Sequence, residues 1–356
     1  MKVVYSETHR QHHPPFEILE GGEKMPMFES PDRMDIILAA LRQTEWAEIV
    51  PPTDFGLPPI LAVHDSDYVD FLQNGFADWQ REGGQVKHQV GDVLMGTTFP
   101  PRRWQHKPSS VAGRVGYYTF DLSCPIVAGT FPAALAAAHC ALTGAQWLLD
   151  GSPAAFALCR PPGHHAGRDF AGGYCYLNNA SIAAQFLAHH GRAAMLDVDY
   201  HAGNGSEDIF YHSPEVLTIS LHGDPASQYP YFVGYADETG AGNGAGYHHN
   251  FPLPKGTGDE DYCQTLAAAL NLLRQFAPQY LVLSFGADIY AGDPLGDLAM
   301  TTAGFKRIGE LIEQLNVPTL IVMEGGYNIA ELGVNTVALL AAFAQRGSNR
   351  AGKRVE

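Results

Sequence analysis

The sequence has few cysteines, few basic residues and no long apolar run. Its five cysteines form no C-x-x-C pair and are odd in number, which argues against a disulfide framework and favours a reducing cytoplasm. No stretch reaches about 18 uninterrupted apolar residues, and the N-terminus M-K-V-V-Y-S-E-T-H has no long apolar core, so we expect a cytoplasmic protein without a membrane partner. With 22 Lys and Arg against 38 Asp and Glu, the formal charge is -16, which opposes nucleic-acid binding and favours cationic small molecules.

Short apolar strands alternate with helical stretches along most of the chain. From Pro132 onward the strand candidates are A-A-F-A-L-C, A-A-M-L-D, V-L-T-I-S-L, Y-L-V-L-S-F and T-L-I-V-M, each separated from the next by a helix or a loop. Apolar strands joined by helices favour parallel βαβ crossovers and a sheet that is covered on both faces. We therefore predict one α/β domain over residues 1–345, with three α-β-α layers and a mostly parallel central sheet.

Three irregular regions and a tail interrupt this pattern. Between about residues 74–130, Gly and Pro pairs break every candidate element, and an excursion of this length inside a compact domain is usually functional or an interaction surface. Glu7–Glu29 and Gly223–Asn250 are predicted as loops. The last helix is expected over Ile329–Ala344, followed by a frayed tail at 346–356.

Polar residues follow the predicted carboxyl ends of five strands. These ends read C-R-P-P-G-H-H, D-V-D-Y-H, S-L-H-G-D, F-G-A-D and E-G-G-Y. Ligands of open parallel α/β sheets bind beyond the carboxyl ends of the strands. Five such ends together are not explained by caps and turns, so they predict a functional site at one edge of the sheet.

The stretch M-L-D-V-D-Y-H-A-G-N-G has the spacing of a metal site. Asp197, Asp199 and His201 alternate along the chain and can share one face of an extended strand. Two carboxylates and an imidazole suit a divalent cation such as zinc, although a solvated loop with a capping aspartate gives the same pattern. A three-ligand site with an open position needs a further donor beside Asp199 and His201, and Asp288 is the best candidate.

Further residues at the strand ends are suited to hydrolysis. His164 and His165 titrate near neutral pH, as a general base for water and a general acid for a leaving amine require. Asp197 and Asn204 can each orient one imidazole, and Tyr327 can donate a hydrogen bond to an oxyanion. A surface histidine pair and a tyrosine packed at a turn are the ordinary alternatives. Together these residues predict a metal-assisted amide hydrolase.

Other histidines and cysteines have no such placement. His248 and His249 lie away from the predicted strand ends, so we expect them at the surface. His12 lies in an unpatterned N-terminal loop, where it could reach the rim of a pocket, but exposure in the loop is the favoured interpretation. Cys159 and Cys175 lie in or beside apolar runs and are expected to be buried rather than nucleophilic.

Six motifs, in this order, resemble the histone deacetylase superfamily with its arginase-deacetylase fold: C-R-P-P-G-H-H-A, G-G-Y-C-Y-L-N-N-A, L-D-V-D-Y-H-A-G-N-G, I-S-L-H, F-G-A-D-I-Y-A-G-D-P-L-G and M-E-G-G-Y-N. The likeness covers nearly the whole chain. Within the superfamily, G-G-E-K-M-P-M-F-E-S-P-D-R and the V-G-Y-Y of the excursion resemble the bacterial acetylpolyamine amidohydrolases.

The resemblance implies a role for each matching residue. It gives zinc to Asp199, His201 and Asp288, and the same ligand set also accepts ferrous iron. It gives the second tandem histidine, His165, the role of general base. Tyr327 matches the tyrosine that polarises the scissile carbonyl.

The resemblance also implies a structural potassium ion, a substrate tunnel and a homodimer. The potassium site comprises the side chains of Asp197 and Ser220 and the backbone oxygens of Asp199, His201 and Leu221. The tunnel residues are Gly173, Tyr174, Tyr229 and, at the rim, Leu295, where the vertebrate polyamine deacetylase of the superfamily has a glutamate. In the polyamine branch the long excursion is associated with dimerisation, and each subunit narrows its neighbour's entrance.

Some positions depart from the family pattern. Ala202 stands where the family commonly has a second histidine, and Ala112 and Ser123 stand where acidic residues for cation recognition are expected, which leaves Asp121 as the nearby carboxylate. We expect a zinc-dependent deacylase of small N-acyl amines, with acylpolyamines as the leading class. A protein acyl-lysine deacylase is the alternative. A binuclear manganese ureohydrolase would need additional bridging carboxylates, and a non-catalytic binding protein is disfavoured because no proposed catalytic position is missing.

Overall fold

A single parallel sheet forms the centre of the molecule. The computed structural model describes residues 1–18, 22–82, 93–100 and 106–351. Eight strands lie in the order β4-β1-β5-β10-β9-β6-β7-β8, and all neighbouring pairs are parallel. They are β1 Lys2–Val4, β4 Glu48–Val50, β5 Ala154–Ala157, β6 Ala193–Asp197, β7 Val216–Gly223, β8 His248–Leu253, β9 Tyr280–Phe285 and β10 Thr319–Met323. The predicted α/β class with a mostly parallel sheet is confirmed.

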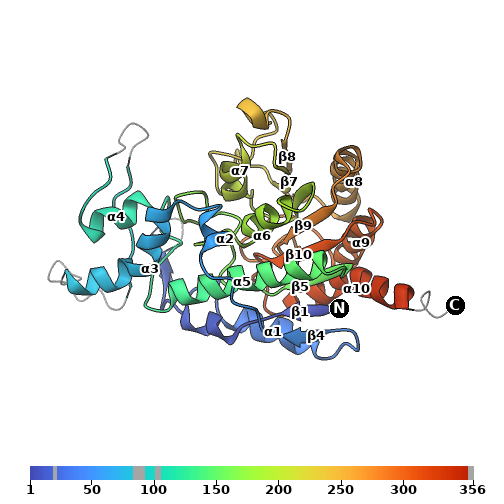
Figure 1. Ribbon diagram of the computed structural model, residues 1–356, viewed down its shortest axis with the longest axis horizontal. Helices are drawn as coiled ribbons and strands as arrows, with labels where there is room; N and C mark the ends of the chain where they lie inside the picture. The colour runs from blue at the N-terminus through green and yellow to red at the C-terminus, as the bar shows by residue number, and fades with distance from the viewer. Residues whose placement is uncertain (19–21, 83–92, 101–105, 352–356) are drawn as a thin grey trace.

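Helices cover both faces of this sheet (Figure 1). They are α1 Asp32–Leu41, α2 Pro58–Leu61, α3 Ser66–Arg81, α4 Val111–Tyr117, α5 Thr130–Leu149, α6 Asn179–Ala188, α7 Asn204–Phe210, α8 Asp259–Phe276, α9 Thr302–Glu313 and α10 Leu332–Ala351. One apolar core lies between the sheet and α5 and α6, and a second lies between the sheet and α1, α8, α9 and α10.

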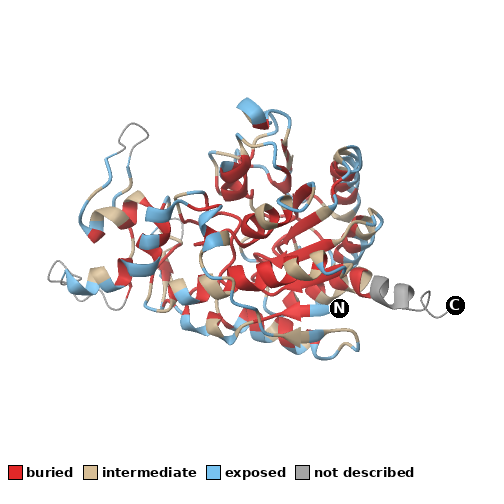
Figure 2. Cartoon of the chain, in the orientation of Figure 1, coloured by how far each residue is buried: buried red, intermediate tan, exposed pale blue. Residues whose placement is uncertain are grey.

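The two cores explain why a central strand such as β5 is apolar at successive positions. In β5, Ala155 and Ala157 face the core under α5, whereas Ala154 and Phe156 face the other core. All four side chains are buried, and Figure 2 colours most of the central strands as buried. A parallel strand that is covered on both faces loses the alternation of a half-exposed strand. This arrangement leaves the carboxyl ends of the strands as the place where polar residues can gather.

The irregular regions contain more structure than predicted. The stretch Glu7–Glu29 holds a 3-10 helix, η1 Glu7–Gln11, and a small hairpin of β2 Glu17–Ile18 with β3 Lys24–Met25. Strand β8 begins inside the predicted loop Gly223–Asn250. Its polar residues His248 and Asn250 are buried against other polar groups, so its sequence lacks the apolar run of the other buried strands.

The prediction that every element is interrupted between about 74 and 130 is wrong for two helices. Helix α3 continues to Arg81 and α4 lies within the excursion, and both lie at one end of the molecule in Figure 1. Tyr68, Phe71, Leu72 and Phe76 are buried with the helical spacing of an amphipathic face. Residues 83–92 and 101–105 of the excursion lie outside the described part of the chain.

The predicted end of the last helix is also wrong. Helix α10 begins at Leu332 and runs to Ala351, so helical backbone continues where we expected a frayed tail. Gly347 lies inside this helix, and one glycine costs a helix only about 1 kcal/mol relative to alanine. The remaining tail residues, 352–356, lie outside the described part.

Two histidines that we expected at the surface are buried. His12 Nδ1 lies 3.0 Å from Thr130 Oγ1 at the start of α5. His248 Nδ1 lies 2.7 Å from Thr218 Oγ1, and its Nε2 lies 3.0 Å from Glu207 Oε2. These polar partners come from distant segments, which is why the sequence pattern did not indicate burial. Cys159 and Cys175 are buried, as predicted.

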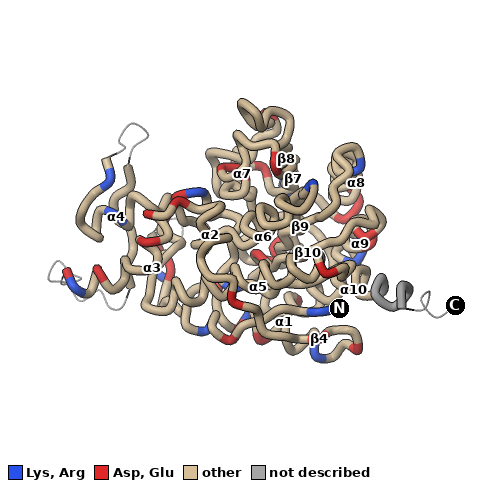
Figure 3. The backbone as a smooth tube through the Cα atoms, in the orientation of Figure 1, with Lys and Arg blue, Asp and Glu red and all other residues tan. Residues whose placement is uncertain are grey.

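Positions of charged residues are spread over many elements in Figure 3. Several acidic residues, among them Asp199 and Asp288, are buried. In the described part of the chain, no helix is both long enough and apolar enough to cross a membrane.

Candidate active site

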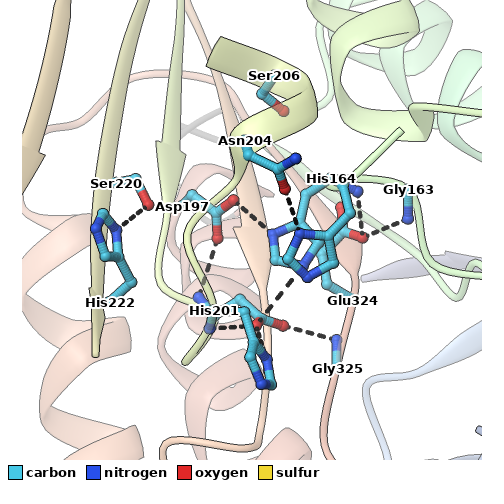
Figure 4. Close-up of polar contacts among 12 residues, drawn as sticks. Gly163, His164, Asp197, His201, Asn204, Ser206, Ser220, His222, Glu324 and Gly325 are labelled. Atoms are coloured by element: carbon cyan, nitrogen blue, oxygen red, sulfur yellow. Dashed lines mark hydrogen bonds and ion pairs between the residues drawn. The ribbon is translucent and has the colours of Figure 1, made fainter. Parts of the chain in front are cut away.

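The candidate site lies where four adjacent strands of the sheet end. β5, β10, β9 and β6 are neighbours in the strand order. The loop after β5 carries His164 and His165, and the loop after β6 carries Asp199 and His201. Asp288 follows β9, and the E-G-G-Y turn follows β10. Figure 4 shows several of these side chains converging from separate strands.

Asp199, His201 and Asp288 form a compact group with the separation of metal ligands. His201 Nδ1 lies 3.3 Å from Asp199 Oδ1 and 3.2 Å from Asp288 Oδ2. Two ligands that are each about 2.0 Å from a tetrahedral zinc ion lie about 3.3 Å from each other. The three ligand atoms all lie within 4.8 Å of one another, and both carboxylates are fully buried. The donor set therefore fits one divalent cation.

The electrostatics of this group also favour a cation. Burial, together with the charge of Asp199, raises the pKa of Asp288 to about 7. Asp288 Oδ2 accepts no hydrogen bond from the described residues, although His201 Nδ1 lies nearby. A buried carboxylate oxygen without a hydrogen bond is costly unless another group compensates its charge. A bound metal ion provides that compensation.

Backbone groups fix the orientation of the two carboxylates. Asp199 Oδ2 accepts a hydrogen bond from Gly325 N at 2.8 Å, and Asp288 Oδ1 accepts one from Tyr200 N at 2.9 Å. A Cβ at Gly325 would lie 2.2 Å from Asp288 Oδ2, and one at Gly286 would lie 2.1 Å from Asp199 Oδ2. The glycines of F-G-A-D and E-G-G-Y are therefore required by the close approach of the backbone to the carboxylates.

The structure brings each tandem histidine together with one polar partner. His164 Nδ1 lies 3.0 Å from Asp197 Oδ2, and His165 Nδ1 lies 2.6 Å from Asn204 Oδ1 (Figure 4). Both partner oxygens are acceptors, so each histidine carries a proton on Nδ1. This leaves Nε2 of His165 available as a proton acceptor.

The two histidines have opposite pKa shifts. Burial lowers the pKa of His164, but the charges of Asp199 and Asp197 outweigh it and raise this pKa to about 10. Burial, together with the neighbouring imidazoles of His164 and His201, lowers the pKa of His165 well below its ordinary value. Groups whose surroundings push their pKa values apart can serve as a charged partner and a base in one reaction.

The turn that carries Tyr327 is held by a buried arginine. Arg33 Nε donates to the carbonyl of Gly326 at 2.7 Å, and its Nη2 donates to that of Glu324 at 2.6 Å. The guanidinium also lies 4.9 Å from the centre of the Tyr327 ring. Burial raises the pKa of Tyr327 well above its ordinary value, so its hydroxyl stays a donor.

Sequence reasoning did not identify the charged residues behind this turn. Glu29 Oε1 accepts hydrogen bonds from Arg33 at 2.9 Å and from Arg160 at 2.8 Å, and all three side chains are buried. Glu324 Oε2 accepts from the backbone N–H groups of Gly163 and His164. The sequence contains one signal that Arg33 is buried: Arg33, Ile37 and Leu41 follow helical spacing and lie on the same buried face of α1.

A second set of possible metal ligands comprises His164, Cys175 and Glu324. Burial raises the pKa of Cys175 well above its ordinary value, so the thiol is protonated and a poor ligand. Among the described residues these are the two groups with ligand atoms close enough to hold an ion. This second set lacks the paired carboxylates of a binuclear manganese site.

The four predicted tunnel residues lie beside His165 and Tyr327. A Cβ at Gly173, where φ is +51°, would lie 2.3 Å from the His165 ring, so only glycine fits. The Tyr229 ring lies edge-on to that of His165 at 5.1 Å, and the Tyr174 ring lies 5.8 Å from that of Tyr327. Leu295 packs against Met27, Tyr174 and Tyr327.

The carboxylate of Asp121 is already used within the protein. Its Oδ2 accepts hydrogen bonds from Gly173 N at 2.9 Å and from the Tyr229 hydroxyl at 2.6 Å, and its Oδ1 accepts one from Ser123 N at 2.9 Å. Asp121 therefore joins the two facing walls of the predicted tunnel.

The predicted potassium ligands Asp197 and Ser220 lie side by side on β6 and β7. His222 Nε2 lies 2.8 Å from the carbonyl of Gly234, so Nε2 carries the proton and Nδ1 accepts the Ser220 hydroxyl at 2.7 Å. Because the Ser220 hydroxyl is the donor in this hydrogen bond, the lone pairs of its oxygen remain available to coordinate a cation. Leu221 follows Ser220 on the same strand.

Comparison with known proteins identifies the family of the chain. The sequence profile of the histone deacetylase domain matches residues 27–343, so the chain belongs to the histone deacetylase family and is an enzyme of that family.

Within the family, the chain is most usefully compared with bacterial acetylpolyamine amidohydrolases. It is 46% identical to acetylpolyamine amidohydrolase 1 of Pseudomonas aeruginosa over 96% of this chain and 99% of that protein. It is 41% identical to the acetylpolyamine amidohydrolase of Mycoplana ramosa over 97% of this chain and 100% of that protein. The crystal structure of acetylpolyamine aminohydrolase from Burkholderia pseudomallei superposes with a TM-score of 0.91 at 41% identity, covering 96% of this chain and 98% of that chain.

Proposed function

We propose that this enzyme is a zinc-dependent amidohydrolase that removes acetyl or other short acyl groups from small N-acylated amines, with acylpolyamines as the main class. The observation that carries the proposal is the convergence of Asp199, His201 and Asp288 beside His165, with the turn that carries Tyr327 hydrogen-bonded to Asp199 through Gly325 N. The names of its relatives, acetylpolyamine amidohydrolases, support the substrate class.

Asp199, His201 and Asp288 would hold the zinc ion, and ferrous iron suits the same ligands. Such an ion, when bound, lowers the pKa of water and polarises the acyl oxygen. We also propose a structural potassium ion at Asp197, Asp199, His201, Ser220 and Leu221.

His165 is the proposed general base. Its Nδ1–H is engaged by Asn204, so Nε2 is the nitrogen that accepts a proton from the attacking water. When the carbon–nitrogen bond breaks, that proton is available to the departing amine nitrogen. His164, protonated and held by Asp197, supplies a positive charge that stabilises the negative charge developing on the acyl oxygen.

Tyr327 and the tunnel residues position the acyl group. The Tyr327 hydroxyl donates a hydrogen bond to the acyl oxygen as negative charge develops there. Gly173, Tyr174 and Tyr229 hold the chain that leads to the scissile amide, and Leu295 lies at the rim. We propose that the enzyme is a homodimer in which the excursion borders the neighbouring entrance, and light scattering tests this assembly.

Comparing substrates tests the proposed function directly. The metal-loaded enzyme is expected to release acetate from acetylputrescine and acetylspermidine with a higher kcat/KM than from acetyl-lysine peptides. Faster cleavage of the peptides would replace the proposal with the protein deacylase. Release of urea from guanidino substrates, with two manganese ions per chain, would replace it with the ureohydrolase.

Replacing Asp121 is expected to weaken substrate binding. Asp121→Ala removes a charged acceptor from Gly173 and Tyr229, and a hydrogen bond to a charged group contributes about 1.5 to 3 kcal/mol. We expect kcat/KM for acetylputrescine to fall at least about 10-fold, mainly through KM. Ser123→Ala keeps the backbone donor to Asp121 and serves as the control. Unchanged kinetics in folded Asp121→Ala would show that this carboxylate does not shape the tunnel.

A further inference from the structure

One buried carboxylate joins the rim of the predicted tunnel to the turn that carries Tyr327. Asp293 lies in the loop after β9 and is 7% exposed. Its Oδ1 accepts a hydrogen bond from Leu295 N at 3.0 Å. Its Oδ2 accepts one from Tyr327 N at 2.7 Å and another from Asn328 N at 2.9 Å. The two oxygens of one side chain therefore hold two segments that are far apart in the sequence.

The opposite side of the same turn is held by other groups. Arg33 donates to the carbonyl oxygens of Glu324 and Gly326, and Asp199 accepts from Gly325 N. These contacts fix the turn before Tyr327. Asp293 fixes the N–H group of Tyr327 itself.

A further contact strengthens the link between the two loops. Asn328 Nδ2 donates to the carbonyl of Gly292 at 2.6 Å, beside Asp293. Leu295 and Tyr327 also belong to one small apolar cluster with Met27 and Tyr174. The backbone contacts and the side-chain packing therefore bring the rim and the tyrosine together in the same place.

We infer that Asp293 is a positioning residue. It places the Tyr327 hydroxyl beside the acyl group, and it links the position of that hydroxyl to the position of Leu295 at the rim. This inference rests on the proposed amidohydrolase function. A hydrogen-bond donor acts on a transition state only if it lies at the right place, and a displacement of about 1 Å can cost about 100-fold in rate. Asp293 touches no reacting atom, so its effect on the reaction passes through Tyr327.

The chemistry of the side chain predicts different results for two substitutions. Asp293→Ala removes the acceptors of Leu295, Tyr327 and Asn328 together. In Asp293→Asn, one oxygen remains, and it can still accept hydrogen bonds from the backbone N–H groups of Tyr327 and Asn328. The amide nitrogen then faces Leu295 N and cannot accept a hydrogen bond from it. The alanine variant should therefore disturb the tyrosine, and the asparagine variant should disturb chiefly the rim.

The test is a double-mutant cycle with Tyr327→Phe, measured as acetylputrescine hydrolysis. Asp293→Ala is expected to lower kcat about 10-fold to 100-fold, whereas Asp293→Asn keeps most of kcat and raises KM. Asp293→Ala in the Tyr327→Phe background is expected to lower kcat little further, because the hydroxyl that Asp293 positions is already absent. Asp259→Ala is the matched control, since Asp259 accepts from Thr301 N at 2.8 Å outside the site and should leave kcat unchanged.

The possible outcomes separate this inference from the proposed function. If the two substitutions lower kcat independently, or if folded Asp293→Ala keeps full kcat, Asp293 is not a positioning residue although the enzyme remains an amidohydrolase. If Asp293→Ala does not fold, Asp293→Asn decides the matter, since an unchanged KM would overturn the coupling to the rim. A wild-type enzyme without amidohydrolase activity would overturn both proposals.

Discussion

Tyr327→Phe is expected to lower kcat for acetylputrescine about 100-fold to 1000-fold, which is the cost of removing one oxyanion donor from an active site. The phenol is buried, and Arg33 and Asp293 hold its backbone on two sides. The substitution removes only the hydroxyl, so the fold and the metal content should not change. KM is expected to change little, because the lost interaction strengthens as charge develops in the transition state.

Steady-state kinetics with metal analysis check this result. Tyr262→Phe is the matched control, since the Tyr262 hydroxyl is buried in the core without a hydrogen-bond partner among the described residues. Removing that hydroxyl should leave kcat unchanged. Full activity in Tyr327→Phe would remove the assigned role of Tyr327 and favour a reaction that does not require an oxyanion donor.

Asp288→Asn is expected to abolish metal retention and to lower kcat/KM by more than about 100-fold. Replacing residues that only orient a metal ligand costs about 10-fold to 100-fold in metal affinity or activity, and loss of a ligand itself should cost more. The asparagine keeps an oxygen for Tyr200 N but removes the charge from the position of Oδ2, which lies 3.2 Å from His201 Nδ1.

The metal content of the purified variant and its activity with added zinc check this prediction. Asp208→Asn is the control, because Asp208 accepts a hydrogen bond from Arg168 N away from the metal group. That variant should retain one ion per chain. If Asp288→Asn bound zinc as tightly as the wild type, the third ligand would have to be another residue.

The sequence indicated the sheet and the candidate metal-binding group because both depend on local pattern. Continuous apolar strands such as β9 predict burial on both faces. Asp199, His201 and Asp288 each follow a strand directly, and carboxyl ends of parallel strands lie at one edge of the sheet. The order of the strands could not be read in the same way, because it depends on which helices pack on which face.

The groups that support the site were harder to predict. Arg33 and Glu324 lie 291 residues apart, and their contact depends on the complete fold. Asp293 resembles an ordinary loop aspartate in the sequence, because its partners are backbone N–H groups that no side-chain pattern reveals. Strand β8 was missed for a related reason, since its buried His248 lies against Thr218 and Glu207 rather than against apolar neighbours.

The most direct test of the metal-dependent hydrolase is titration of the metal-free enzyme with zinc, with acetylputrescine hydrolysis followed at each addition. Activity is expected to rise in proportion to added zinc and to level off at one ion per chain, because Asp199, His201 and Asp288 form one mononuclear group. Full hydrolysis by the metal-free protein, or activity that requires two manganese ions per chain, would contradict the proposed site.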